Sequence, residues 1–192
     1  NSDAVAQRLE MLCKLPVDEA SDVEELVDHV LGSDADAKLL NGLCALLTSI
    51  QEYAGVVKVR EAILAEQERA FGEESKEVGS ALFYLGGAYR RQGDNAKARD
   101  AYERALPIYE REYGSDSTEV SKVLNSLGIA YGDLGDYAKQ RDVLERALPI
   151  VEREYGSDHV NVAVVLGNLG SAYGNLGDYA TRRDKLGRLI AI

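Results

Sequence analysis

Apolar residues recur every three or four positions along most of the chain, which is the spacing of one face of an α-helix. Glycine and aspartate interrupt this pattern at intervals, and no segment alternates apolar and polar residues as a half-buried strand would. The pattern therefore predicts an all-α fold. The expected helices span residues 4–15, 19–31, 36–50, 53–70, 76–91, 95–112, 118–133, 137–154, 160–175 and 179–190.

The helical pattern repeats at a regular interval along the chain. The segment LNSLGIAYGDLGDYAKQRDVLERALPIVEREYGSD begins at Leu124, and close copies begin at Leu82 and Leu166, which defines a 42-residue repeat. A more divergent copy in the same register begins at Leu40. Because a single helix pair cannot bury its apolar face alone, neighbouring units are expected to stack. We expect one solenoid domain over residues 1–192, made of about five antiparallel helix pairs.

The five pairs are not equivalent in sequence. Residues 37–192 contain four units of the 42-residue repeat, the last of them truncated. Residues 1–36 contain a divergent pair that aligns poorly with the period. This pair holds ten acidic and two basic residues, a net charge of −8, which leaves −3 to the rest of the chain. The acidity of the protein is therefore largely a property of its N-terminal segment.

Helix ends and breaks can also be predicted from the sequence. Asp136 suits the N-cap of a second helix, because its carboxylate can accept from free backbone N–H groups. Asp116 and Glu119, three residues apart, predict a capping box for the first helix of the same unit. Pro107 and Pro149 lie inside second helices, where proline removes a backbone hydrogen bond. We predict a kink at each proline.

The motifs within each unit resemble those of tetratricopeptide repeats. The first helix contains Leu-Gly-x-x-Tyr, the turn contains Gly-Asp-Tyr, and the second helix contains Arg-Ala-Leu. The 42-residue period and the Tyr-Gly-Ser-Asp linker are similar to the variant found in kinesin light chains. This resemblance covers residues 37–192, and Leu127, Gly128 and Tyr131 match the family's helix-packing residues.

The resemblance implies a right-handed superhelical solenoid with a groove lined by the first helices. In the family, this groove holds an extended peptide or a helix of a partner, and no catalysis or cofactor accompanies the fold. The chain departs from the family where the second helix crosses the first. Ala98 is small there, as expected, whereas Gln140 and Arg182 are large. We expect these two side chains either to reach past the crossing to solvent or to loosen the pair.

Successive helical residues turn by about 100°, so the groove should be lined by residues beside the apolar stripe of each first helix. Asn168 matches a place where asparagines of related proteins hold the main chain of a ligand, and an amide can both donate and accept. The candidate groove residues are Lys38, Asn41, Phe83, Tyr84, Arg90, Arg91, Lys122, Asn125, Asn168, Ser171 and Asn175.

Charge narrows the class of partner. The chain carries −11 at neutral pH. This charge argues against nucleic acid, because affinity for phosphate backbones depends on lysine and arginine. Lys38, Arg90, Arg91 and Lys122 nonetheless predict a locally basic groove, which favours an acidic peptide or a C-terminal carboxylate. The alternative is that these four are ordinary exposed side chains.

The sequence gives little support to an enzyme. It contains two histidines, His29 and His159, in segments of different kinds, and no HExxH, GxSxG or paired CxxC motif. Cys13 and Cys44 fit no disulfide or zinc spacing, and we interpret both as buried free thiols. We therefore expect a non-catalytic interaction module without a metal or cofactor.

Location and assembly follow from weaker features. Free thiols indicate an intracellular compartment, the cytoplasm or an organelle interior reached after N-terminal processing. No run of about 18 apolar residues is present, so we expect no membrane insertion. An apolar surface near residues 186–192 supports an alternative function, that of a structural subunit in a larger multiprotein complex.

Overall fold

The computed structural model describes residues 20–32 and 37–190, and in this part of the chain short turns connect helices and no strand is present. Its helices are α2 (Ala20–Leu31), α3 (Ala37–Ser49), α4 (Tyr53–Phe71), α5 (Lys76–Gln92), α6 (Asn95–Tyr113), α7 (Thr118–Asp133), α8 (Tyr137–Tyr155), α9 (Val160–Asn175) and α10 (Tyr179–Ile190). The all-α prediction is confirmed, and the predicted bounds agree with these. The helix expected over residues 4–15 lies outside the described residues.

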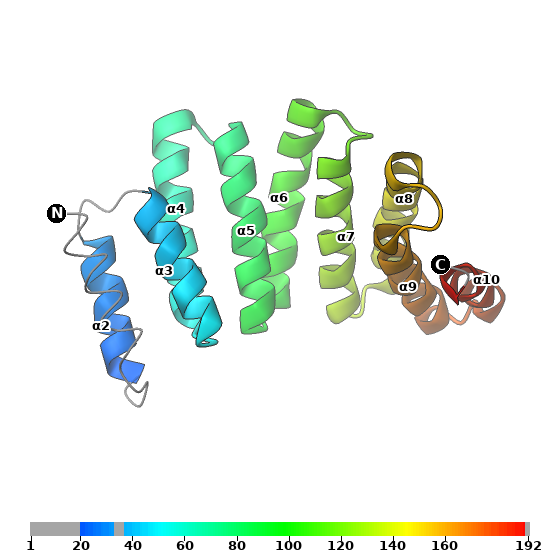
Figure 1. Cartoon of the computed structure of the whole chain (residues 1–192), viewed down its shortest axis with the longest axis horizontal. Coiled ribbons are helices and arrows are strands. Elements are labelled where there is room, and N and C mark those ends of the chain that lie inside the picture. Colours follow the sequence, from blue (N-terminus) through cyan, green and yellow to red (C-terminus); the bar gives the residue numbers. More distant parts are fainter. Residues whose placement is uncertain (1–19, 33–36, 191–192) are drawn as a thin grey trace.

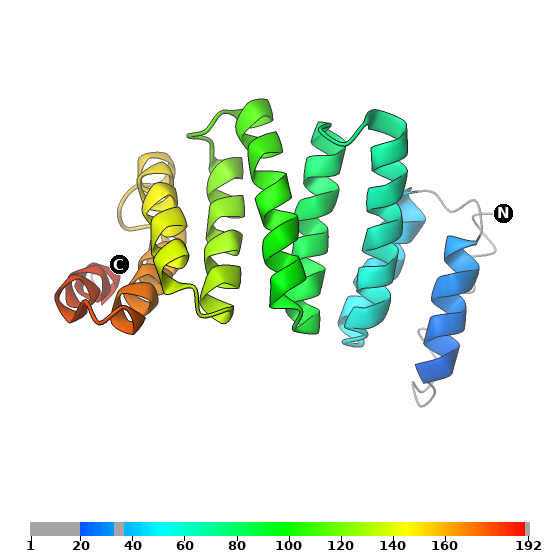
Figure 2. The same cartoon turned by 180° about the vertical axis from the view of Figure 1, so that it is seen from behind.

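The helices pack in chain order as antiparallel pairs that stand side by side in a row (Figure 1). The first helices α3, α5, α7 and α9 lie on the side nearest the viewer in Figure 1. The second helices α4, α6 and α8 are nearest in the reverse view of Figure 2. We call the outward surface of α3, α5, α7 and α9 the first-helix face, and that of α4, α6, α8 and α10 the second-helix face.

A glycine on each of the first helices α5, α7 and α9 lets the second helix approach closely. A Cβ added at Gly128 would lie 2.7 Å from Cγ of Leu144, and one at Gly86 would lie 2.7 Å from the ring of Tyr102. Leu127, beside Gly128, is 2 % exposed and belongs to a cluster of buried apolar residues that extends from α2 to α7. The Leu-Gly-x-x-Tyr motif is thus a packing motif.

The N-cap predicted from the sequence is confirmed for α8 and wrong for α7. Asp136 caps α8, with its carboxylate 3.2 Å from the backbone nitrogen of Lys139. The capping box at Asp116 and Glu119 is wrong, because the N-cap of α7 is Ser117, whose hydroxyl accepts from the N–H of Val120 at 3.3 Å. Ser117 is the last residue with an extended backbone, so Asp116 lies one residue too early.

Prolines do not end the second helices. Pro107 lies within α6 and Pro149 within α8, and each helix continues beyond its proline to the tyrosine at its end. This agrees with the predicted helices over residues 95–112 and 137–154, each of which includes its proline. The kink at each position stays a prediction.

The crossing of the two helices is tight at Gln140, contrary to both expectations from the sequence. Gln140 is 5 % exposed, so it does not reach past the crossing to solvent. A Cβ at Gly132 would lie 2.6 Å from its Nε2, so the first helix makes room for the long side chain instead of loosening the pair. Arg182 also lies against a glycine of the first helix, with Cδ 2.9 Å from a Cβ placed on Gly174. Unlike Gln140 it is exposed, so this side chain does reach solvent.

Two further expectations concern thiols and membranes. Cys44 is a buried free cysteine, and burial raises the pKa of its thiol. Cys13 lies outside the described residues. None of the helices described is both long enough and apolar enough to cross a membrane.

Candidate functional site

The candidate groove residues belong to the first helices, and those whose side chains the structure describes are exposed or half-buried. Lys38 is in the first turn of α3, and its side chain lies outside the described part of the structure. The half-buried candidates are Phe83, Asn125 and Asn168. The exposed ones are Asn41, Tyr84, Arg90, Arg91, Lys122, Ser171 and Asn175.

An aromatic cluster occupies the part of the first-helix face around α5. The ring of Phe83 lies 5.7 Å from that of Tyr84, 5.8 Å from Tyr102 and 6.0 Å from Tyr109, measured between centroids. The edge-to-face and tilted geometries are those that aromatic rings favour. Tyr84 is 56 % exposed, so the cluster presents one large apolar side chain to a ligand.

Arg60 adds a cation to this surface that was not among the candidates, because those were chosen from the first helices. It belongs to the second helix α4, yet its Nη1 donates to Oδ1 of Asn41 at 2.8 Å. Its guanidinium carbon also lies 5.1 Å from the ring centroid of Tyr84, a cation–π distance. Arg60 and Tyr102 occupy equivalent positions of successive repeats. Because α4 and α6 both pack against α5, Arg60 contacts Tyr84 and Tyr102 contacts Phe83.

Burial and charge act in opposite directions on the phenol of Tyr102. Burial raises its pKa, whereas the nearby guanidinium of Arg90 and the hydroxyl of Ser126 lower it. Arg90 is thus close enough to the aromatic cluster to act on it electrostatically. The cluster therefore joins α4, α5 and α6 into one surface with cationic neighbours.

An amide pair lies on the same face, between α7 and α9. The Nδ2 of Asn168 donates to Oδ1 of Asn125 at 3.1 Å. A pocket of about 180 Å³ adjoins the pair. The pocket is lined by Ser121, Lys122, Asn125, Val151, Tyr155, Asn161, Val164 and Val165.

The cations do not gather at one point. Arg90 and Arg91 lie in the last turn of α5, whereas Lys122 lies near the start of α7. Because first helices run in the same direction, these positions are at opposite ends of the face. Lys122 is 3.9 Å from a carboxylate oxygen of Glu119, a loose ion pair.

Two candidates on α9 belong to neither the aromatic cluster nor the amide pair. Within residues 37–190, neither Ser171 nor Asn175 makes a hydrogen bond or ion pair with another candidate through its side chain. Nor do the residues that the structure describes contain a group of three or more His, Cys, Asp or Glu side chains placed to hold a metal ion. The site is therefore an extended surface of aromatic, amide and cationic groups.

Comparison with known protein families agrees with the stacked helix pairs. The model of the tetratricopeptide repeat matches residues 36–111, 77–150 and 119–181, which together exceed half of the chain. The chain belongs to the tetratricopeptide repeat family. This fold is typically non-catalytic and generally forms protein–protein interaction modules. No curated protein sequence matches the chain.

Solved structures with the same fold include kinesin light chain-like tetratricopeptide repeat proteins. BtubC (BKLC) from P. vanneervenii is 24 % identical, with a TM-score of 0.70 over 98 % of this chain and 79 % of that one. A putative kinesin light chain of Podospora anserina with nearly identical repeats is 18 % identical, with a TM-score of 0.73 over 98 % and 86 %. MamA is 16 % identical, with a TM-score of 0.63 over 88 % and 82 %.

Proposed function

We propose that the protein is a non-catalytic interaction module that binds an acidic peptide of a partner protein on the first-helix face. The observation that carries this proposal is the combination of exposed cations at both ends of the face with the exposed Tyr84 between them. Arg90 and Arg91 end α5, and Lys122 begins α7. Carboxylates spaced along one peptide can meet both ends.

The amide pair gives this surface a way to hold the peptide backbone. The bond between the two residues uses Nδ2 of Asn168 and Oδ1 of Asn125. In the part of the chain that the structure describes, Nδ2 of Asn125 and Oδ1 of Asn168 have no other hydrogen-bond partner. One donor and one acceptor are therefore available for a peptide C=O and N–H group.

Arg60 supports the same class of ligand. Its guanidinium is held between Asn41 and the ring of Tyr84, so it is oriented before any ligand arrives. A guanidinium has five N–H donors, so donors remain for a ligand after one of them bonds to the amide oxygen of Asn41. A carboxylate next to Tyr84 would therefore meet a positioned cation and an aromatic surface together.

The test is a titration with a peptide that contains several Asp and Glu residues and ends in a free carboxylate. We expect a dissociation constant in the micromolar range, roughly −8 kcal/mol. The double variant Arg90→Glu, Lys122→Glu should bind about tenfold more weakly, because two exposed attractions become repulsions. Calorimetry measures both constants.

The control for each single variant, Arg90→Glu or Lys122→Glu, is Arg69→Glu, an exposed cation in the last turn of α4. It changes the net charge in the same direction but should leave the affinity of the acidic peptide unchanged. The peptide with Asn and Gln in place of the acids should bind weakly to all variants. An unchanged affinity in the double variant would remove the first-helix face from the account.

A further inference from the structure

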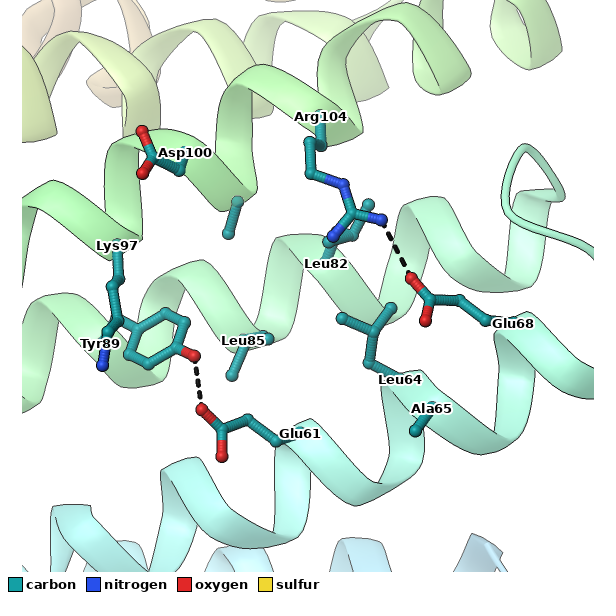
Figure 3. A pocket seen from close by; sticks show the side chains of 11 residues that line it. Glu61, Leu64, Ala65, Glu68, Leu82, Leu85, Tyr89, Lys97, Asp100 and Arg104 are labelled. Atoms are coloured by element: carbon teal, nitrogen blue, oxygen red, sulfur yellow. Dashed lines mark hydrogen bonds and ion pairs between the residues drawn. The ribbon is translucent and has the colours of Figure 1, made fainter.

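A pocket of about 250 Å³ lies on the second-helix face, away from the peptide surface (Figure 3). It lies between α4 and α6, and residues of α5 form part of its lining. Its lining combines an apolar floor with a charged rim. The residues are Glu61, Leu64, Ala65, Glu68, Leu82, Leu85, Tyr89, Lys97, Asp100, Ala101 and Arg104.

Most charges on the rim already have partners. Arg104 pairs with Glu68 at 2.9 Å, and Lys97 pairs with Asp94 at 3.3 Å. Glu61 differs, because it accepts a hydrogen bond from the neutral phenol of Tyr89 at 2.5 Å. Among the described residues, no lysine or arginine forms an ion pair with Glu61. The Nζ of Lys97 lies over the ring of Tyr89 instead, 5.3 Å from its centroid. The pocket thus has a carboxylate that is bound by a phenol and forms no ion pair within the described residues.

A later repeat of the same chain shows which side chain can pack beside the glutamate that is equivalent to Glu61. Ala101 lines the pocket, and Lys185 stands at the equivalent position two repeats later. The counterpart of Glu61 is Glu145. The Nζ of Lys185 lies 3.2 Å from Oε1 of Glu145, and the lysine side chain is only 14 % exposed.

We call each hydrogen bond between a tyrosine of a first helix and a glutamate of the preceding second helix a joint. The first joint is Tyr89 with Glu61, the second Tyr131 with Glu103, and the third Tyr173 with Glu145. Glu145 accepts from the phenol of Tyr173 at 2.9 Å, as Glu61 accepts from Tyr89. At the third joint, then, a lysine side chain reaches the same phenol-bound carboxylate. At the first joint, Ala101 has only a methyl group at the position from which Lys185 extends.

We propose that the pocket at the first joint binds a lysine side chain of a partner protein. The aliphatic stem would lie over the floor at Leu64 and Leu85, and the ammonium would donate to Glu61. Lysine suits the site because its apolar stem can be buried while its charged head meets a carboxylate. Asp100 at the rim is already paired with Arg99 at 2.5 Å, so Glu61 is the carboxylate left for an ammonium group. A protein partner is favoured because the group that fills the equivalent position at the third joint is itself a lysine side chain.

The chemistry is tested with n-butylammonium, which has the stem and charge of lysine, followed through the methyl NMR signals of Leu64, Leu85 and Ala101. We expect saturable shifts. Methylammonium, which lacks most of the stem, should bind at least about tenfold more weakly. The neutral n-butanol should bind about fivefold more weakly. Equal affinity of n-butanol and n-butylammonium, or no saturation with the latter, would overturn the proposal.

Variants locate the site. Ala101→Lys reproduces the residue of the third joint and should abolish n-butylammonium binding, because the pocket becomes occupied by its own chain. Ala96→Lys, at an exposed position of the same helix, adds the same charge outside the pocket and should leave binding intact. Glu61→Gln should reduce binding of n-butylammonium and leave that of n-butanol unchanged. Persistent binding in Ala101→Lys would contradict the proposed site.

The third joint supplies a second, independent measurement. Lys185→Ala removes the internal lysine and should lower the melting temperature. Added n-butylammonium should raise the melting temperature of Lys185→Ala more than that of the unaltered protein, whereas n-butanol should not. An equal rise in both proteins would remove the precedent on which the proposal rests.

A peptide arm tests whether the lysine comes from a protein. The peptide acetyl-Ala-Ala-Lys-Ala-Ala-amide should shift the same methyl signals as n-butylammonium, and its Nε-acetyl-lysine form should not. Binding of n-butylammonium without binding of the lysine peptide would overturn the assignment to a partner protein. Acidic-peptide binding on the first-helix face should be the same in Ala101→Lys, so the two proposals fail separately.

Discussion

At the scale of single residues, the distance between two helices depends on which glycine faces which large side chain. Gly86 lies against the ring of Tyr102, which is 3 % exposed and has little room to move. Gly42 is also inside a first helix, but a Cβ added there would meet nothing within 4 Å. The two glycines therefore differ in environment while sharing the same secondary structure.

The same substitution should have opposite effects at these two positions. Gly86→Ala should lower the free energy of unfolding by about 1–3 kcal/mol, because the new methyl group overlaps the tyrosine ring. Gly42→Ala should raise it by up to about 1 kcal/mol, because alanine is the better helix former. Urea denaturation followed by circular dichroism measures both values. Changes of the same sign would contradict this account of the crossing.

The sequence indicates which residues meet at the crossing but not how their volumes fit. Gly86 was predictable because it belongs to the Leu-Gly-x-x-Tyr motif. The burial of Gln140 was not, because it depends on Gly132 in the opposite helix. In the preceding unit the sizes are reversed, with Arg90 in the register of Gly132 and Ala98 in that of Gln140. A pattern read along one helix does not report the space left by the other.

At the scale of helices, neighbouring units are joined by a polar contact that recurs at three joints of the described chain. In each, a tyrosine at the end of a first helix donates to a glutamate of the preceding second helix. The pairs are Tyr89 with Glu61, Tyr131 with Glu103, and Tyr173 with Glu145. Burial raises the pKa of each phenol, and the glutamate raises it further.

These joints predict a loss of stability at alkaline pH. A phenol whose pKa is raised by folding contributes stability below its unfolded pKa of about 10 and loses it as pH rises toward the folded value. The free energy of unfolding should therefore fall with increasing pH above about 10. Urea denaturation at a series of pH values measures this slope.

Single variants identify the tyrosines responsible for the slope. Tyr131→Phe should make the alkaline decrease shallower, because one of the raised phenols is gone. Tyr179→Phe removes a phenol that is 63 % exposed and outside the three joints, and should leave the slope unchanged. If all tyrosines ionised near pH 10 while the helical structure stayed intact, the pKa of the joint tyrosines would not be raised by folding, and the prediction would be contradicted.

The sequence predicted helix positions better than contacts between helices. Helix bounds follow from glycines and caps that are local in the sequence, although Ser117 and not Asp116 caps α7. Arg60 was missed because it reaches the first-helix face from a second helix. Packing of α4 against α3 brings it to Asn41, and stacking of the next unit brings it to Tyr84. Both are relations between segments that no local pattern contains.

At the scale of the whole molecule, the two faces offer different chemistry in one chain of net charge −11. The first-helix face carries cations at both ends, an aromatic cluster and an amide pair. The second-helix face carries a pocket with the carboxylate of Glu61 at its rim. On our proposals, acidic and basic segments of partners bind to opposite sides of the same row of helices.

The most direct test of the central claim, binding on the first-helix face, is NMR mapping of the acidic peptide on the ¹⁵N-labelled protein. We predict saturable shifts in the side-chain amides of Asn125 and Asn168 and in the backbone of α5, with the methyl groups of Leu64 and Leu85 unaffected. Shifts confined to α4, α6 and α8, or no saturable shift at all, would contradict it.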